Sequence, residues 1–203
     1  MTPPTSASPA TQRAGASFER KLRTRDAIVS AAAQALAERG LPALTVGDIL
    51  ELAGVARATF YAHFSDKHDV TREVVALMWR RAASRYANFA AAPRHTEASV
   101  RAWMDELAHS WRDHHEEVVA LLRGAPAELI QASDGYLDEF AAVLVDDGRH
   151  WRCPPPEAKL RAALLIVQLE RAMLDLCRGA WQVPEEALLD TLSKLWLQAL
   201  CAP

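Results

Sequence analysis

The side chains with the most evident chemistry lie in one short segment, residues 57–63. They are small, basic or hydrogen-bonding, and they surround a single phenylalanine: Arg57, Ala58, Thr59, Tyr61, Ala62 and His63. Arginine donates paired hydrogen bonds to a guanine edge, small residues let a helix approach closely, and apolar atoms contact thymine methyl groups. The segment therefore fits a short helix that enters the major groove of DNA.

The residues before this segment predict how it is positioned. Thr45 and Asp48 have nearly the spacing of a capping box that begins a helix, and Gly54 ends that helix after Ala53. A steep turn into a second helix needs a left-handed residue, which glycine supplies. The apolar residues spaced to close a small core between the two helices are Ile49, Leu52, Val55 and Phe60. The pattern predicts a helix-turn-helix, and an ordinary helical hairpin with a glycine turn is the alternative.

Helical periodicity runs through almost the whole chain after Phe18, while strand signals are nearly absent. We therefore predict an all-α fold of about nine helices. Gly40 ends the first helix, and Pro42 lies two residues beyond it. The expected helices cover residues 22–39, 45–53, 57–63, 65–88, 96–113, 116–123, 127–145, 157–180 and 184–200.

The chain divides into three expected parts. Residues 1–17 are rich in Pro, Ser, Thr and Ala and lack the apolar centre of a secretion signal, so we expect a disordered arm. Residues 18–66 form the helix-turn-helix domain, and residues 67–203 form a larger helical domain. The net charge of −3 excludes a generally basic, nucleic-acid-coating protein, so DNA contact needs a local patch. Such a patch precedes and begins the first helix: Arg13, Arg20, Lys21, Arg23 and Arg25.

Other classes of protein leave no signature in the sequence. Phosphate-binding glycine loops, nucleophile elbows and zinc-protease motifs are absent, so we expect no enzyme and no cofactor. No histidine pair among His109, His114 and His115 has the spacing of metal ligands on one helical face, so we expect no metal. Three scattered cysteines and no long apolar run predict a cytoplasmic protein without disulfides or membrane spans.

The segment from about residue 22 to 70 resembles the TetR family of bacterial repressors. The residues that carry the likeness stand in a specific order and spacing: Thr45, Ala53-Gly54-Val55, Thr59-Phe60-Tyr61, His63-Phe64 and Lys67. The resemblance implies phosphate contacts from Thr45, Tyr61, His63 and Lys67. It also implies that Arg57, Ala58 and Thr59, with Tyr61 beside them, lie against base edges. Lys67 suits this role because the first turn of a helix also attracts phosphate through its backbone N–H groups.

Two positions depart from the family pattern. The first turn of the second helix holds Val46 and Gly47, where many members carry a basic or polar residue that reaches DNA. Ala58 stands where glycine is frequent before the Thr-aromatic-Tyr motif. Base discrimination is therefore expected mainly from Arg57 and Thr59, with the basic arm supplementing them in the minor groove.

The second half of the chain predicts dimerisation and ligand binding. The segment 157–180 is apolar on nearly all sides and 184–200 adds a further apolar face, so a monomer would expose a large patch. One unusually large monomer core is the alternative, whereas the family resemblance implies a homodimer through these two helices. It also implies a cavity for a small hydrophobic or aromatic effector, with these candidate lining residues: Met78, Trp103, Leu107, Trp111, Phe140, Leu144 and Gln168. Ordinary core packing is the alternative for each of them.

These observations lead to one expected function and two rivals. The expected function is a dimeric repressor that binds a palindromic operator and is released by the effector. The rivals are an enzyme, and a helical interaction module whose helix-turn-helix no longer binds DNA. The complete set of Tyr61, His63 and Lys67 disfavours the interaction module.

Overall fold

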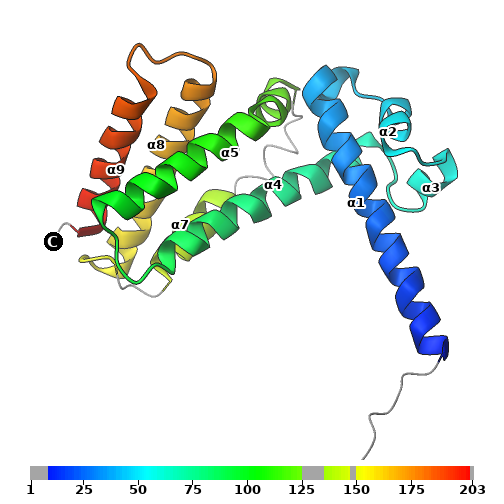
Figure 1. Ribbon diagram of the computed structural model, residues 1–203, viewed down its shortest axis with the longest axis horizontal. Coiled ribbons are helices and arrows are strands. Elements are labelled where there is room, and N and C mark those ends of the chain that lie inside the picture. Colours follow the sequence, from blue (N-terminus) through cyan, green and yellow to red (C-terminus); the bar gives the residue numbers. More distant parts are fainter. Residues whose placement is uncertain (1–8, 125–134, 147–149, 202–203) are drawn as a thin grey trace, which may run out of the picture. The chain divides into compact units, whose positions relative to one another are not determined.

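The computed structural model describes residues 9–124, 135–146 and 150–201, and every regular element in this part of the chain is α-helical. This confirms the expected all-α fold (Figure 1). The helices are α1 (Pro9–Ala43), α2 (Val46–Ala53), α3 (Arg57–Tyr61), α4 (Lys67–Ala90), α5 (Glu97–Gly124), α7 (Tyr136–Val145), α8 (Pro155–Cys177) and α9 (Glu185–Cys201). None of the described helices is long and apolar enough to cross a membrane.

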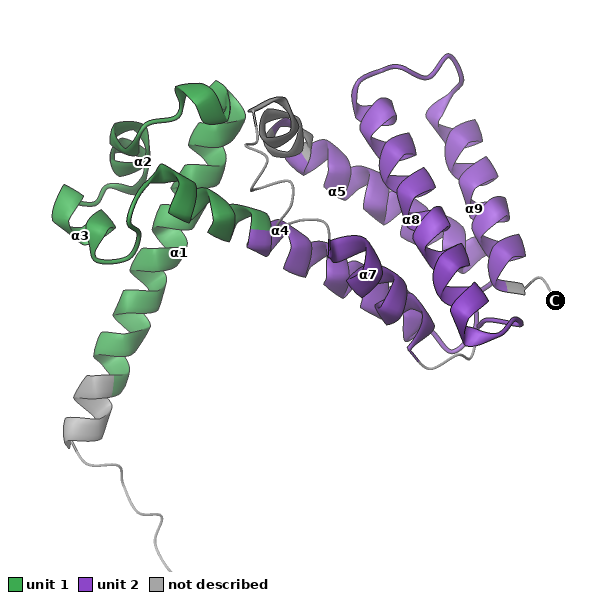
Figure 2. Ribbon diagram, turned by 180° about the vertical axis from the view of Figure 1, so that it is seen from behind, with its two compact units in different colours: residues 1–75 green, residues 76–203 purple. Residues whose placement is uncertain are grey.

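The chain forms two compact units, residues 1–75 and 76–203, shown in separate colours in Figure 2. The division falls inside α4, later than the expected boundary after residue 66. The cause is visible in the first turns of α4, where Val70 and Val74 are buried and still belong to the first unit. We call residues 1–75 the N-terminal unit and residues 76–203 the C-terminal unit.

The N-terminal unit is built on α1. Apolar residues along one face of this helix are buried: Ile28, Ala31, Ala32, Ala35 and Leu36. Gly40 has a φ of 71°, so the regular helix breaks there, before Pro42, as the sequence indicated. The helix begins much earlier than residue 22, at Pro9, so part of the segment expected to be a disordered arm is helical. Alanines at 10, 14 and 16 favour a helix, and proline is suited to its first turn.

In the C-terminal unit, α7 packs along α8, and α5 packs against both α8 and α9. The helix α5 runs without a break to Gly124, so a separate helix over 116–123 was wrongly expected. No glycine or proline interrupts the chain between residues 97 and 123, and the helix ends at Gly124. The segment 125–134, which includes the start of the helix expected over 127–145, lies outside the described residues.

The helices α8 and α9 lie side by side (Figure 1). Pro155 and Pro156 occupy the first turn of α8, which tolerates proline because a first turn needs no N–H donors from its own residues. The helix ends two residues before Gly179, whose φ of 64° turns the chain toward α9. The core of this unit is rich in aromatic rings, with Trp196 fully buried and Phe140 1% exposed.

Candidate nucleic-acid interface

The turn between α2 and α3 has the geometry that the sequence predicts. Thr45 caps α2: its hydroxyl accepts from the Asp48 N–H at 3.2 Å, and the Asp48 carboxylate accepts from the Thr45 N–H at 2.9 Å. These bonds form the complete capping box. At the other end, Gly54 has φ 63° and ψ 30°, the left-handed conformation that a side chain resists.

The small core beneath this turn is closed by fewer residues than expected. Ile49 and Phe60 are fully buried, whereas Val55 is half-buried. Leu52 is 42% exposed, so its assignment to this core was wrong. Leu52 follows Ile49 at a spacing typical of one helical face, but it stands in the last turn of the eight-residue helix α2 and stays largely in solvent.

The burial of Phe60 determines which face of α3 remains in solvent. Its ring packs edge-on to Tyr61, at 5.4 Å between centroids, and contacts Phe64 at 5.8 Å. Arg57, Ala58 and Tyr61 are exposed, and Thr59 is half-exposed. The residues expected at base edges therefore share the outer surface of one rigidly anchored turn.

Lys67 lies differently from the other expected phosphate contacts. Its Nζ atom donates to three backbone carbonyls where α1 ends, those of Leu41 at 3.2 Å, Pro42 at 3.4 Å and Leu44 at 2.9 Å. An ammonium group has three hydrogens, so these carbonyls match its full donor capacity. In this structure Lys67 ties the start of α4 to the end of α1.

The start of α4 is capped by aspartates. The Asp69 N–H donates to the Asp66 carboxylate at 2.8 Å, while the Asp69 carboxylate accepts from the Ser65 N–H at 2.9 Å. The carboxylate that caps the first turn therefore comes from Asp66. Hydrogen bonds from Ser65 lower the pKa of Asp69. The negative charges also suit the N-terminal end of the helix dipole.

A second brace, which the sequence analysis did not anticipate, centres on Arg25 of α1. Its guanidinium donates to the Glu73 carboxylate at 2.8 Å and to the His63 carbonyl at 3.3 Å. It also lies over the Phe64 ring, 4.4 Å from the centroid. Arg25 had been grouped with the basic patch, and no local pattern reveals a contact with a residue 48 positions away.

His63 is partly buried beside this brace. Burial, with smaller contributions from the positive charges of Lys21 and Arg25, lowers the pKa of the His63 imidazole. A neutral imidazole is therefore favoured at neutral pH. On α1, the basic side chains of Arg20, Lys21 and Arg23 are all exposed.

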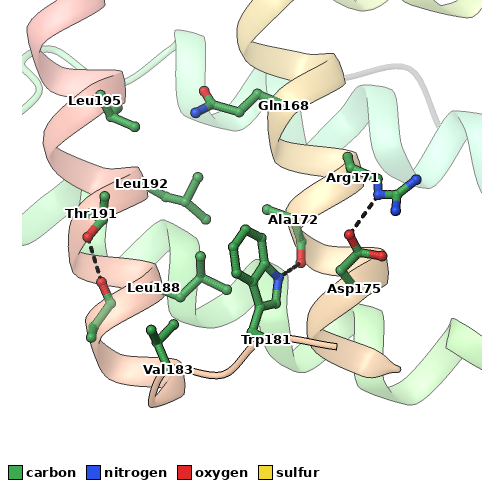
Figure 3. Close-up of a pocket in the computed structure, with 11 residues that line it drawn as sticks. Gln168, Arg171, Ala172, Asp175, Trp181, Val183, Leu188, Thr191, Leu192 and Leu195 are labelled. Atoms are coloured by element: carbon green, nitrogen blue, oxygen red, sulfur yellow. Dashed lines mark hydrogen bonds and ion pairs between the residues drawn. The ribbon is translucent and has the colours of Figure 1, made fainter. Parts of the chain in front are cut away.

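The residues expected to line a ligand cavity separate into three groups. Leu107, Phe140 and Leu144 are core residues, each at most 4% exposed. Met78, Trp103 and Trp111 are partly buried, and the two tryptophans pack against that core. Gln168 is exposed, and it lines an apolar groove of about 450 Å³ between α8 and α9 (Figure 3).

The sequence analysis overlooked the polar groups near Phe140. Tyr136 donates its hydroxyl hydrogen to the Glu170 carboxylate at 3.0 Å, and the Trp79 ring stacks on the Tyr136 ring at 4.2 Å. Glu170 lies between buried Leu169 and the outward-facing Arg171, so periodicity alone gave no reason to single it out.

Comparisons with known proteins agree with this geometry. Residues 28–74 match the family model described as "Bacterial regulatory proteins, tetR family". The chain is 42% identical over 52 residues to the HTH-type transcriptional repressor BepR of Brucella suis, covering 26% of this chain and 25% of that protein. It is 39% identical over 57 residues to the HTH-type transcriptional regulator TtgR of Pseudomonas putida, covering 28% and 27%. The matched segment thus spans about a quarter of each curated relative.

Solved structures share the fold over most of the chain. The transcriptional regulator FadR from Bacillus subtilis, in complex with stearoyl-CoA, superposes with a TM-score of 0.65 at 17% identity, over 85% of this chain and 97% of that one. A TetR family transcription regulator from Marinobacter aquaeolei gives a TM-score of 0.63 at 18% identity, over 90% and 97%. Residues 28–74 therefore match the TetR family of bacterial regulatory proteins, and the fold over most of the chain is similar to that of solved TetR-family regulators.

Proposed function

We propose that the chain is a transcriptional repressor that binds a palindromic DNA site as a homodimer and leaves it when a small molecule binds the C-terminal unit. The observation that carries the proposal is the exposed surface of α3. Arg57, Thr59 and Tyr61 stand on a turn fixed by fully buried Phe60 and left-handed Gly54. A rigid short helix with one arginine and small neighbours suits a major groove.

Within this interface, Arg57, Ala58 and Thr59 lie against base edges, while Thr45, Tyr61 and His63 face phosphates. Lys67 acts mainly by holding α4 against the end of α1, because its ammonium already donates to three carbonyls. The exposed Arg20, Lys21 and Arg23 of α1 add sequence-independent attraction to the phosphate backbone.

The homodimer forms through α8 and α9. One side of α8 carries Leu160, Leu164 and Val167 at helical spacing, and these residues are 60%, 62% and 47% exposed. The same helix also lines the apolar groove between α8 and α9, where Figure 3 shows Gln168 beside Leu192 and Leu195 of α9. Exposed apolar side chains are unfavourable in water, and a second copy packed through the same two helices would cover them.

Selection from a random pool of DNA duplexes tests the proposal. We expect enrichment of an inverted repeat with half-sites about one helical turn apart. Light scattering should give twice the chain mass, and Leu164→Glu should yield monomers that no longer retain the selected duplex. A clean monomer, or a pool without any enriched sequence, would contradict the proposal and favour a helical interaction module.

A further inference from the structure

Arg25 differs from the other described basic side chains in the first half of α1. Arg20, Lys21 and Arg23 are exposed, and their charges are free to face solvent or DNA. The side chain of Arg25 is 35% exposed and forms an ion pair with Glu73, whose side chain is 29% exposed. Partly buried pairs are screened by salt less than exposed ones. The charge of Arg25 is therefore engaged within the N-terminal unit.

One guanidinium group makes three contacts at once. One of its terminal nitrogens donates to the Glu73 carboxylate at 2.8 Å, and the other donates to the His63 carbonyl at 3.3 Å. Its central carbon lies 4.4 Å from the centroid of the Phe64 ring. Arginine combines a rigid fork of donors with a flat face that packs on aromatic rings, and the ammonium group of lysine has neither feature. The three contacts together therefore require arginine at this position.

The residues that Arg25 contacts after α3 continue directly from that helix. The N–H groups of His63 and Phe64 each donate to the Phe60 carbonyl at 2.9 Å. The rings of Phe60 and Phe64 lie 5.8 Å apart, and Phe60 is fully buried beneath α3. Arg25 is thus connected to α3 through one backbone carbonyl and one aromatic ring. A shift of either would change the orientation of the exposed side of α3.

The ion pair attaches the same guanidinium to α4. Glu73 lies between Val70 and Val74 in the sequence, and both valines are buried in the N-terminal unit. Thr71 is only 1% exposed, and its hydroxyl donates to the Lys67 carbonyl at 2.7 Å. These turns of α4 are therefore firmly packed, and the Glu73 carboxylate holds Arg25 from a fixed support.

We propose that Arg25 is a positioning residue for DNA sequence recognition and not a phosphate ligand. It acts through the His63 carbonyl and the Phe64 ring, and it sets the orientation in which α3 meets the base edges. Hydrogen bonds to base edges depend on angle as well as distance, so a small rotation of α3 costs sequence discrimination more than general affinity. This inference rests on the proposed DNA-binding function and adds a residue of α1 to it.

A conservative substitution separates positioning from charge. Arg25→Lys keeps the positive charge and loses the fork, so the ratio of affinities for the selected duplex and a scrambled one should fall about tenfold. The affinity for the scrambled duplex and its salt dependence should stay as in the wild type. Arg72→Lys is the matched control, because this exposed arginine of α4 pairs with Asp69 at 3.2 Å and should leave the ratio unchanged. Fluorescence anisotropy of the full chain at several salt concentrations measures both affinities.

The affinity ratio also separates positioning from a loss of folded protein. A smaller folded fraction lowers the affinity for both duplexes by the same factor and leaves their ratio unchanged. Without DNA, amide hydrogen exchange at His63 and Phe64 should be faster in Arg25→Lys than in the wild type, because their N–H groups lie in the segment that Arg25 holds. Arg72→Lys should leave this exchange rate as in the wild type.

Substitution of the partner tests whether Arg25 acts from within the protein. Glu73→Gln removes the ion pair, so it should also lower the affinity ratio. The double variant with Arg25→Lys should lower the ratio by less than the product of the two single effects, because both substitutions disrupt the same contact. If Arg25→Lys lowers the ratio and Glu73→Gln does not, Arg25 contacts the bases directly, and the positioning role is wrong.

A wild-type ratio in Arg25→Lys would overturn the positioning role, and so would an equal loss of affinity on both duplexes. A phosphate ligand gives the first result, because lysine also binds phosphate. A residue that only stabilises the fold gives the second. Unchanged hydrogen exchange at His63 and Phe64 would equally contradict it. A wild type that prefers neither duplex would contradict the repressor function itself, which distinguishes that failure from a failure of Arg25 alone.

Discussion

The two units of the molecule differ in how completely their polar groups are hydrogen-bonded. In the N-terminal unit, Lys67, Arg25 and Asp48 each make several hydrogen bonds that join different elements or cap a helix. In the C-terminal unit, the described residues include buried polar atoms with no partner, on Trp79, Arg85, His95, His150 and Trp196. All the unpartnered atoms found in the described residues belong to this second unit.

The proposed function calls for such a contrast, with a fixed DNA-binding surface in one unit and a ligand site in the other. A DNA-binding helix needs a defined geometry, and the hydrogen bonds between α1 and α4, with those that cap α2, support it. A site for a small molecule needs polar groups that the protein itself leaves unsatisfied, and these cost stability until a ligand arrives. The following predictions test this difference, beginning with the largest expected effect.

Glu170→Gln should stabilise the C-terminal unit in the absence of ligand. Burial raises the pKa of Glu170 from 4.5 to about 7, so the folded state binds the proton more tightly than the unfolded state does. The wild type therefore loses stability as the pH rises from 4.5 to 7, and the variant does not. At pH 8 the free energy of unfolding should increase by about 2–3 kcal/mol. Urea titrations of the wild type and the variant at pH 4 and pH 8 measure this increase. If the two proteins differ by the same free energy of unfolding at both pH values, the raised pKa of Glu170 is not the cause.

Lys67→Met should destabilise the N-terminal unit by about 2 kcal/mol, because three carbonyls lose a charged donor. Lys159→Met on α8 is the control. The ion pair of Lys159 with Asp138 at 3.4 Å is exposed, so this variant should cost less than about 1 kcal/mol. Both are measured by urea unfolding. If Lys67→Met unfolds like the wild type but binds all duplexes more weakly with a smaller salt dependence, Lys67 is a phosphate contact instead.

Substitution of His95 should give the smallest change in stability, and the pH dependence of that change should be opposite to that of Glu170. Burial and the nearby His150 lower the pKa of His95 from 6.5 to about 4, and its ring stacks on Phe89 at 4.1 Å. The folded state therefore resists protonation, and stability is lost as the pH falls from 6.5 toward 4. At pH 5, His95→Leu should therefore raise the free energy of unfolding by about 1 kcal/mol relative to the wild type. This figure is smaller than the full pKa shift implies, because His95 is only half-buried. A stability difference that is the same at pH 5 and pH 7.5 would exclude this origin.

The sequence predicted the N-terminal unit better than the C-terminal unit for physical reasons. Left-handed Gly54 and the Thr45 capping box follow from local backbone chemistry, and the structure confirms both. The contacts of Lys67 and Arg25 join residues more than twenty positions apart, so no local pattern could reveal them. Both side chains looked like phosphate ligands because a positive charge on a surface segment suits either role.

The C-terminal unit was harder because its core and its candidate site use the same residue types. Phe140 and Leu107 were expected in a cavity and are core residues. Gln168 is exposed and stands one helical turn after Leu164. The helical periodicity could therefore have assigned it to the same exposed side of α8. Glu170 stands out only once the structure brings Tyr136 beside it.

The central claim is that the exposed side of α3 reads DNA sequence, and one set of titrations tests it most directly. Fluorescence anisotropy of the wild type, Arg57→Ala and Arg152→Ala should be compared on the selected duplex and on a scrambled one, at several salt concentrations. Arg152 is an exposed arginine of the C-terminal unit, so its variant matches the change in net charge. We expect Arg57→Ala to lose about 1–3 kcal/mol on the selected duplex and much less on the scrambled one, while Arg152→Ala changes neither. An equal loss on both duplexes, or no loss at all, would show that α3 does not read the sequence.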